Sequence, residues 1–428
     1  MYAVIDSTSR KITKNYAVVN GTTRKITKMY AVVDGVTRLI FDGKGMVINP
    51  VFNGAIISCG GARQIYVLNS GAWETMCSYN SITPNAMLSY SGEYYISPGK
   101  TDAELYKWNT NSEEYDAIVS DYSMTDDFST HTLAANGTSL SISQGVISAD
   151  GSKALVLANR KDSNYGATYG LIYDLSNDTF VVSQVVGNIN SLGVSSSSTN
   201  ASWSVNKVVA NNDLSVIVCD YEASWKYSGT TYYEDGYSVW VKSGSNYTKI
   251  LSEEVDEDEF SLNYKAISVS ANGKYITVPS SSTEDTVIVY YRDGINLTKI
   301  GSINKEVFSV IINEELNILS ISARSTSGSY LSISTYALSE SSITSLGSYT
   351  STISYSFSIL DESRDRGNIL AGGTNGYYDS SSGQYITYSN VANYKVSNNT
   401  SYAITSLTQD GIAVSSNSGS ATGKYIGI

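Results

Sequence analysis

Short apolar runs separated by turn residues dominate the chain after residue 43. A turn of polar residues or glycine, followed by an apolar run, recurs at eight places: Asn53-Gly54, Ser91-Gly92, Asp150-Gly151, Asn212-Asp213, Asn272-Gly273, Glu314-Glu315, Arg366-Gly367 and Asp410-Gly411. The spacing between these turns, roughly 40 to 60 residues, is typical of the blades of a β-propeller with some long loops. The eight signals therefore predict about seven blades, with the two ends of the chain sharing one blade to close the ring.

Further runs within each repeat support an all-β propeller as the fold class. A second, often aromatic run follows most of the turns and leads through another turn to a third, as in LYKWNTNSEEY from Leu105 and LIYDLSNDTF from Leu171. The segments ISADGSKALVLA and VSANGKYITVP resemble the blade openings of WD-like and TolB-like propellers, although the Gly-His and Trp-Asp signatures are absent. Ring closure would remove exposed sheet edges. Six or eight blades, a row of β-sandwiches and a long β-solenoid remain as alternatives.

The first 42 residues follow a different pattern, a 14-residue repeat in three copies. Each copy is an apolar run, a turn pair and a second run. Asn20-Gly21 and Asp34-Gly35 are strong signals for two-residue hairpin turns, because both turn positions need a positive φ. In the middle copy such a turn would pair Val18 with Thr23 and Tyr16 with Lys25. We therefore expect three β-hairpins over residues 1–42.

Charge separates these hairpins from the propeller domain expected over residues 43–428. Residues 1–42 hold seven basic and three acidic side chains, a balance of +4, so the remainder carries −12 − 4 = −16. Isolated hairpins are marginal in water, so these must pack on their own domain or on a partner. The charge contrast favours an assembly arm, and the acidic body argues against broad nucleic-acid binding. The candidate binding residues are the aligned aromatic and basic positions of the three copies: Tyr2, Tyr16, Tyr30, Arg10, Arg24 and Arg38.

The repeat also resembles a known group of sequences. In most of its positions each unit reads YAVV, then Asn or Asp, Gly, any residue and TRKI; the first copy departs at its turn, Asp6-Ser7, and at Ile5 and Ser9, and the third has Leu39 in place of Lys. Such tandem units resemble those that open many uncharacterised proteins of phages and prophages of Gram-positive gut bacteria. The resemblance covers about a tenth of the chain. It implies a structural protein of the virion or tail, part of an oligomeric assembly, with an arm that docks to other virion proteins and a propeller that binds a protein or the host surface.

Two other functions stay open. One is a bacterial propeller lectin that binds a glycan without any virion, and a less favoured one is a glycan hydrolase that uses two carboxylates. Sialidase propellers carry Asp-box turns, and Ser148-Ala149-Asp150-Gly151 comes nearest, but its glycine is one place early and the tryptophan is missing. We expect no enzyme. We also expect a virion location, since no ordinary signal peptide and no run near the ~18 apolar residues of a membrane helix is present.

Few residues offer catalytic or metal chemistry. His131 is the only imidazole, and the spacings of Cys59, Cys77 and Cys219 match no zinc pattern. The acidic run 253–259 lacks the glycine that lets a calcium loop fold around its ion, so a solvated acidic loop is expected and calcium binding is left open. We therefore predict no catalytic residue, no metal site, no cofactor and free thiols.

Tyrosine, with 35 copies, is the remaining recognition chemistry. Adjacent residues of a strand point to opposite faces, so one ring of each tyrosine pair is expected to pack between blades and the other to face water. Exposed tyrosines beside serine and asparagine make good recognition surfaces. Insertions near residues 110–135 and 222–236 are the predicted places for glycan or protein binding. The pairs concerned are Tyr94-Tyr95, Tyr232-Tyr233, Tyr290-Tyr291 and Tyr377-Tyr378.

Overall fold

The computed structural model of this chain forms two compact units, Met1–Asn49 and Pro50–Ile428. The structure describes, with gaps, residues 2–5, 8–11, 16–19, 22–25, 28–33, 36–42, 50–59, 62–69, 72–79, 87–131, 139–161, 165–193, 199–256, 264–283, 285–313, 316–324, 330–354, 358–363, 366–379, 384–398, 403–416 and 421–426.

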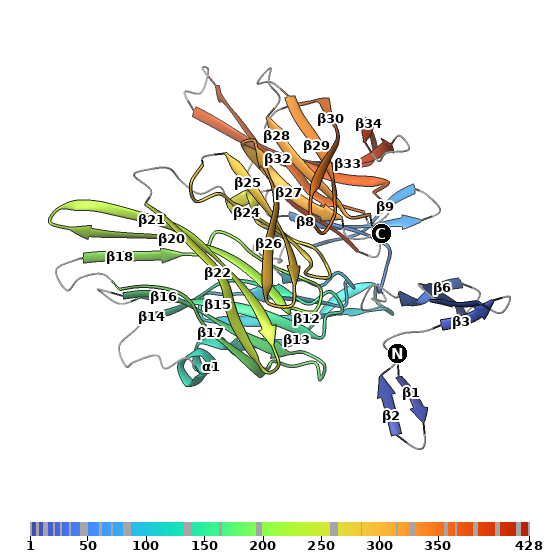
Figure 1. The fold of residues 1–428 in the computed structure, drawn as a ribbon, viewed down its shortest axis with the longest axis horizontal. Coiled ribbons are helices and arrows are strands. Elements are labelled where there is room, and N and C mark those ends of the chain that lie inside the picture. The colour runs from blue at the N-terminus through green and yellow to red at the C-terminus, as the bar shows by residue number, and fades with distance from the viewer. Residues whose placement is uncertain are drawn as a thin grey trace. The chain divides into compact units, whose positions relative to one another are not determined.

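Three two-stranded antiparallel hairpins make up the described part of the first unit (Figure 1). They are β1 (Tyr2–Ile5) with β2 (Thr8–Lys11), β3 (Tyr16–Val19) with β4 (Thr22–Lys25), and β5 (Lys28–Val33) with β6 (Val36–Asp42). In the middle hairpin Tyr16 pairs with Lys25 and Val18 with Thr23, which confirms the predicted register. The turn residues that join these strands lie outside the described residues.

The described residues of the second unit form seven antiparallel sheets, a β-propeller as predicted (Figure 1). Most blades run from an inner to an outer strand in chain order, because each strand pairs with the next through a short turn. The first three blades are β10 (Met87–Leu88), β11 (Tyr94–Pro98), β12 (Asp102–Asn109) and β13 (Glu114–Ser123); β14 (Ser139–Ile147), β15 (Lys153–Lys161), β16 (Tyr165–Asp174) and β17 (Val181–Gly193); and β18 (Thr199–Ser204) with β19 (Val208–Ala210), β20 (Val216–Tyr227), β21 (Thr230–Ser243) and β22 (Asn246–Asp256).

Blades 4 to 6 repeat this order. They are β23 (Ser268–Val269), β24 (Tyr275–Pro279), β25 (Thr286–Asp293) and β26 (Asn296–Asn304); β27 (Val307–Asn313), β28 (Ile318–Arg324), β29 (Tyr330–Leu338) and β30 (Ile343–Ser354); and β31 (Ser358–Glu362), β32 (Asn368–Asp379), β33 (Gln384–Asn398) and β34 (Ile404–Ser416). A short 3-10 helix, η1 (Tyr264–Ala266), precedes blade 4.

The seventh blade joins the two ends of the propeller unit, as the sequence predicted. Its inner strand is β35 (Ala421–Ile426), and its other strands are β7 (Gly54–Cys59), β8 (Ala62–Asn69) and β9 (Ala72–Tyr79). Tyr425 is fully buried, and its backbone N–H donates to Oδ2 of Asp361 in blade 6 (2.7 Å). On the other side, Nζ of Lys424 donates to the carbonyl of Leu88 in blade 1 (2.9 Å). The carboxyl-terminal strand thus links the last blade to both neighbours.

A recurring turn between the first two strands of a blade accounts for the repeated sequence signal. Its first residue is Ser or Asn, whose side-chain oxygen accepts a hydrogen bond from the backbone N–H five residues later, at 2.7–3.2 Å. The fourth residue has a positive φ, which favours glycine. Five turns share both features, and they begin at Ser89, Ser148, Asn211, Ser270 and Ser363.

One of the eight predicted turns is wrong. Asp410-Gly411 lies inside β34, where the pairing passes from Ala392↔Ala413 to Tyr394↔Gln409 and leaves extra residues on β34. The segment is therefore a bulge in an outer strand, which the same residue types favour because a bulge also needs unusual backbone angles. Each of the other seven signals precedes the second strand of a different blade, so the number of these signals equals the number of blades.

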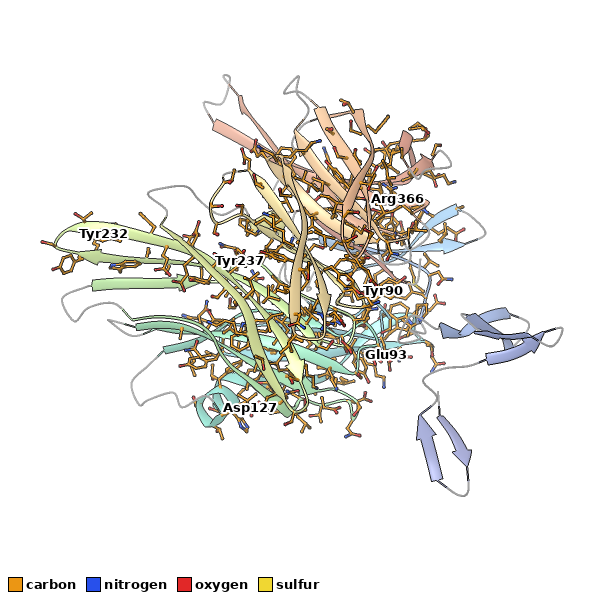
Figure 2. All side chains as sticks on the ribbon, viewed as in Figure 1. Tyr90, Glu93, Asp127, Tyr232, Tyr237 and Arg366 are labelled. Atoms are coloured by element: carbon orange, nitrogen blue, oxygen red, sulfur yellow. The ribbon has the colours of Figure 1, made fainter. Side chains whose placement is uncertain are left out.

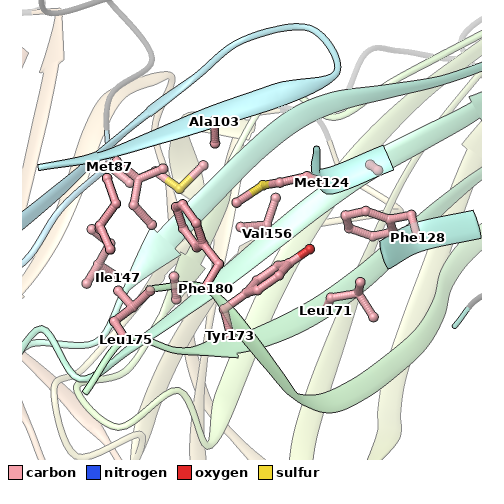
Figure 3. Close-up of a cluster of buried hydrophobic side chains, with 14 of the residues drawn as sticks. Met87, Ala103, Met124, Phe128, Ile147, Val156, Leu171, Tyr173, Leu175 and Phe180 are labelled. Atoms are coloured by element: carbon pink, nitrogen blue, oxygen red, sulfur yellow. The ribbon is translucent and has the colours of Figure 1, made fainter. Parts of the chain in front are cut away.

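The apolar core lies between adjacent blades, because each blade buries both faces of its inner strands. The largest cluster joins blades 1 and 2 around Tyr173 and Phe180 (Figure 3). The α-helix α1 (Met124–His131) adds Met124 and Phe128 to this cluster, so part of the insertion predicted near 110–135 contributes to the core, while most of its other described residues are exposed or half-buried. His131 is exposed and is the last residue of this helix.

Candidate binding site on a projecting hairpin

A hairpin of blade 3 extends beyond the strands of its neighbour. Strands β20 and β21 have 12 and 14 residues, whereas the corresponding strands of blade 4, β24 and β25, have 5 and 8. Ser228 and Gly229 join the two long strands with φ of 50° and 88°, and positive φ at both turn residues is the mark of a type I′ turn. Residues 222–235, here called the projecting hairpin, reach outward from the propeller body (Figure 1).

The base of this hairpin is held on both faces. Ile217 packs with Leu157 of blade 2, and Val218 packs with Ile276 of blade 4. Side chains alternate between the faces along a strand, so each face of the projecting hairpin continues one of these two packed faces. They are called here the blade-2 face and the blade-4 face. A base fixed in this way keeps the outer part of the hairpin in one orientation.

Aromatic side chains gather at the outer end of the hairpin. Trp225 and Tyr232 are cross-strand partners on the blade-2 face, with nearly parallel rings (16°) whose centroids are 5.9 Å apart. Tyr227 follows on the same face and is 46% exposed, while Tyr232 is 37% exposed. Figure 2 shows Tyr232 at the outer end and Tyr237 closer to the body. Exposed aromatic rings on a fixed backbone provide contact area at low entropic cost.

The rings continue inward into a hydrogen-bonded group on the same face. The hydroxyl of Tyr221 donates to Oε1 of Glu234 (3.2 Å). Gly236 makes room for this tyrosine, since a Cβ there would lie only 2.3 Å from its Cζ. Burial, together with the negative charges of Glu234 and Glu254, raises the pKa of Tyr221, so its hydroxyl stays protonated and serves as a donor.

The strands around the hairpin are acidic. Residues 199–204, 222–235 and 253–256 together contain six acidic side chains and one basic one, Lys226. Glu254 is exposed and pairs through its backbone with Gly236, which places it on the blade-2 face beside Glu234. A negative surface of this kind attracts cations and repels anionic ligands.

The expectation that one ring of each tyrosine pair is buried and the other exposed is wrong for two pairs. Tyr94 and Tyr95 are both buried, because β11 lies between neighbouring blades and both of its faces are covered. Tyr232 and Tyr233 are both exposed, because they lie near the tip of a hairpin that extends past the strands of blade 4. Position in the propeller therefore overrides strand alternation. Tyr290 and Tyr291 are both partly buried, and the side chains of Tyr377 and Tyr378 lie outside the described residues.

The other predicted residues fall in three places. The side chains of the arm residues lie outside the described residues, and these are Tyr2, Tyr16, Tyr30, Arg10, Arg24 and Arg38. The first part of the acidic run belongs to β22, and the rest of it is likewise not described. Cys219 is a free, buried thiol whose pKa is raised by that burial. Within the described ranges, no group of three or more His, Cys, Asp or Glu could hold a metal ion, and no helix is long and apolar enough to span a membrane.

The sequence predicted a recognition site near 222–236, and the structure places Tyr227, Tyr232 and Tyr233 exposed on this hairpin. The stacking of Tyr232 on the half-buried Trp225 was not predicted. The signal that could have found it is the Ser228-Gly229 pair midway between two β-prone runs. A two-residue turn there fixes the register, and the register places these two rings opposite each other.

Comparison with known proteins gives similarity of fold only. No family model and no curated protein matches the chain. Among solved structures, a 6-phosphogluconolactonase candidate from Bacteroides fragilis is 9% identical, with 87% of this chain and 98% of that one covered and a TM-score of 0.48. A protein from Lactobacillus plantarum is 10% identical (88% and 100% covered, TM-score 0.46), and an oligogalacturonate lyase in complex with manganese is 8% identical (81% and 93% covered, TM-score 0.41). Similarities this low carry no activity or ligand to this chain.

Proposed function

We propose that this chain is a structural protein of a phage virion whose propeller binds a molecule on the host surface through the projecting hairpin. The observation that carries the binding role is the exposed ring of Tyr232 stacked on the half-buried ring of Trp225, on a hairpin whose base is packed against two blades. The virion role is supported by the resemblance of the repeats over residues 1–42. In this proposal those repeats dock to other virion proteins, and the propeller acts by binding rather than catalysis.

The test is binding of the purified full chain to host cells. Replacing Trp225 and Tyr232 together by alanine should weaken binding at least about tenfold, because buried aromatic anchors dominate interfaces at ~2 kcal/mol or more each. Tyr233→Ala is the matched control. Tyr233 is adjacent in sequence and 43% exposed, but it lies on the blade-4 face.

The expected result is loss of binding in the double variant and normal binding in the control, with equal thermal stability of all three proteins. Equal binding of the double variant and the unchanged chain would overturn the role of the hairpin.

The lectin alternative uses the same hairpin without a particle. Quantitative peptide mass spectrometry of purified particles separates the two functions. A stoichiometric amount of this chain in the particles supports the virion protein, whereas its presence only in the soluble or cell-bound fraction supports the lectin.

A further inference from the structure

The arrangement on the blade-2 face of the projecting hairpin narrows the chemistry of its ligand. The rings of Trp225 and Tyr232 stack on one another, 16° from parallel, so the exposed ring of Tyr232 offers a flat surface and the pair does not converge into a cage around a rounded cation. The flat apolar face of a sugar ring matches such rings, because its C–H groups meet the negative face of the aromatic system. The geometry of the rings therefore favours a glycan over a small isolated cation.

The charges next to the rings decide between kinds of glycan. Along β21, Glu234 is two residues from Tyr232, about 7 Å by strand geometry, and on the same face. Glu254 of β22 lies further along that face and is exposed. Substituents of a sugar stacked on Tyr232 are thus within reach of carboxylates. A sulfated or phosphorylated glycan would be repelled, whereas an ammonium group would gain both ion pairing and attraction to the rings.

We infer that the ligand of the projecting hairpin is a glycan with free amino groups, stacked on the exposed ring of Tyr232, which Trp225 supports, and held by Glu234 and Glu254. This inference rests on the proposed function of the hairpin as the host-binding site and names its ligand class. The hydroxyl of Tyr221 donates to Oε1 of Glu234 and restrains this carboxylate.

Two probes that differ only in acetylation test the inference. A hexasaccharide of glucosamine and a hexasaccharide of N-acetylglucosamine are titrated into the full chain by calorimetry, at a mildly acidic pH where the free amines are protonated. The amino form should bind about tenfold more tightly, since two exposed ion pairs distinguish it from the acetylated form. A sulfated polysaccharide is the third probe, and it should not bind.

Matched variants test whether Glu234 and Glu254 cause the preference for the amino form. Glu234→Gln with Glu254→Gln should bring the affinity for the amino form down to that for the acetylated form, because the amides keep the shape and remove the charge. The control is Glu222→Gln with Asp235→Asn. These two residues pair with each other through their backbones and lie on the blade-4 face, so neutralising them should leave the preference for the amino form intact. Trp225→Ala with Tyr232→Ala should weaken both probes.

The ligand class of the hairpin and its role in host binding can be overturned separately. If the aromatic double variant still loses cell binding but the unchanged chain binds both hexasaccharides equally or prefers the sulfated probe, the amino-glycan inference is overturned and the proposed function stands. If the aromatic double variant binds cells and both hexasaccharides like the unchanged chain, the proposed function itself is overturned.

Discussion

At the scale of single residues, the sequence did not reveal the buried charges of the propeller. Asp220 of β20 is 4% exposed, and its carboxylate accepts a hydrogen bond from the backbone N–H of Lys207. The ammonium of Lys207 donates to the carbonyl of Ile267 in the next blade (2.7 Å). Burial raises the pKa of Asp220 to about 7 and lowers the pKa of Lys207 to about 8. No motif surrounds either residue, since only the packing of three blades desolvates them.

Replacing Asp220 by Asn should therefore remove part of the pH dependence of stability. The ordinary pKa of aspartate is 3.8 and the pKa of folded Asp220 is about 7, so between these values the folded chain binds more protons than the unfolded chain. The free energy of unfolding of the unchanged chain then falls as pH rises through this window. The melting temperature of the Asp220→Asn variant, measured by circular dichroism, should rise relative to that of the unchanged chain between about pH 4 and about pH 7. Above about pH 7 this residue should cause no further change in the difference. A constant difference across the window would contradict this assignment.

At the scale of elements, the turns were predictable and their surroundings were not. Serine or asparagine at the first position and glycine at the fourth are local signals, because they reflect one hydrogen bond and one backbone angle. Seven of the eight signals precede the second strand of a blade. The eighth, Asp410-Gly411, was misassigned because a bulge needs the same residue types. Which face of a strand is covered depends on neighbouring blades, so the burial of Tyr94-Tyr95 and the exposure of Tyr232-Tyr233 were not predictable from alternation.

The packing of these turns against each other can be measured with two glycines. Gly273 and Gly294 both have positive φ, 70° and 62°. A Cβ at Gly273 would lie 2.6 Å from Cγ2 of Val216 in blade 3, whereas no atom lies within 4 Å of one at Gly294. Gly294→Ala should lower the free energy of unfolding by about 1 kcal/mol, through the backbone strain alone. Gly273→Ala should lower it by about 2–4 kcal/mol, because overpacking adds to that strain. Urea unfolding of both variants measures the difference, and equal losses would show that the turn at Gly273 is not packed against blade 3.

At the scale of the whole molecule, the sequence predicted the ring and the way it closes. Seven blades and a shared last blade follow from the number of turns and from the cost of an open sheet edge. Among the described residues of the second unit, the first strand of the ring is β7, which begins at Gly54, and the last is β35. The docking role of residues 1–42 stays a prediction, since it depends on a partner. The projecting hairpin was predicted as an insertion with exposed tyrosines, but the stacking of Trp225 with Tyr232 follows only from the strand register.

Two truncations should therefore have opposite effects. Removing residues 1–42 leaves every blade complete, so the melting temperature should not change. Removing residues 421–428 takes away β35, with the buried Tyr425 and its hydrogen bond to Asp361, so cooperative unfolding should be lost or shifted to a much lower temperature. Calorimetric scans of both proteins test this. A large destabilisation by the first truncation would mean that the arm is part of the folded body.

The projecting hairpin is proposed to be the surface that binds the host. Hydrogen exchange of the full chain, measured by mass spectrometry with and without isolated host cell walls, tests this proposal. We expect slower exchange in peptides from 222–235 when cell walls are present, with peptides of the β25–β26 turn at 293–296 unchanged as an internal control. Protection confined to other parts of the propeller, with 222–235 unchanged, would contradict it.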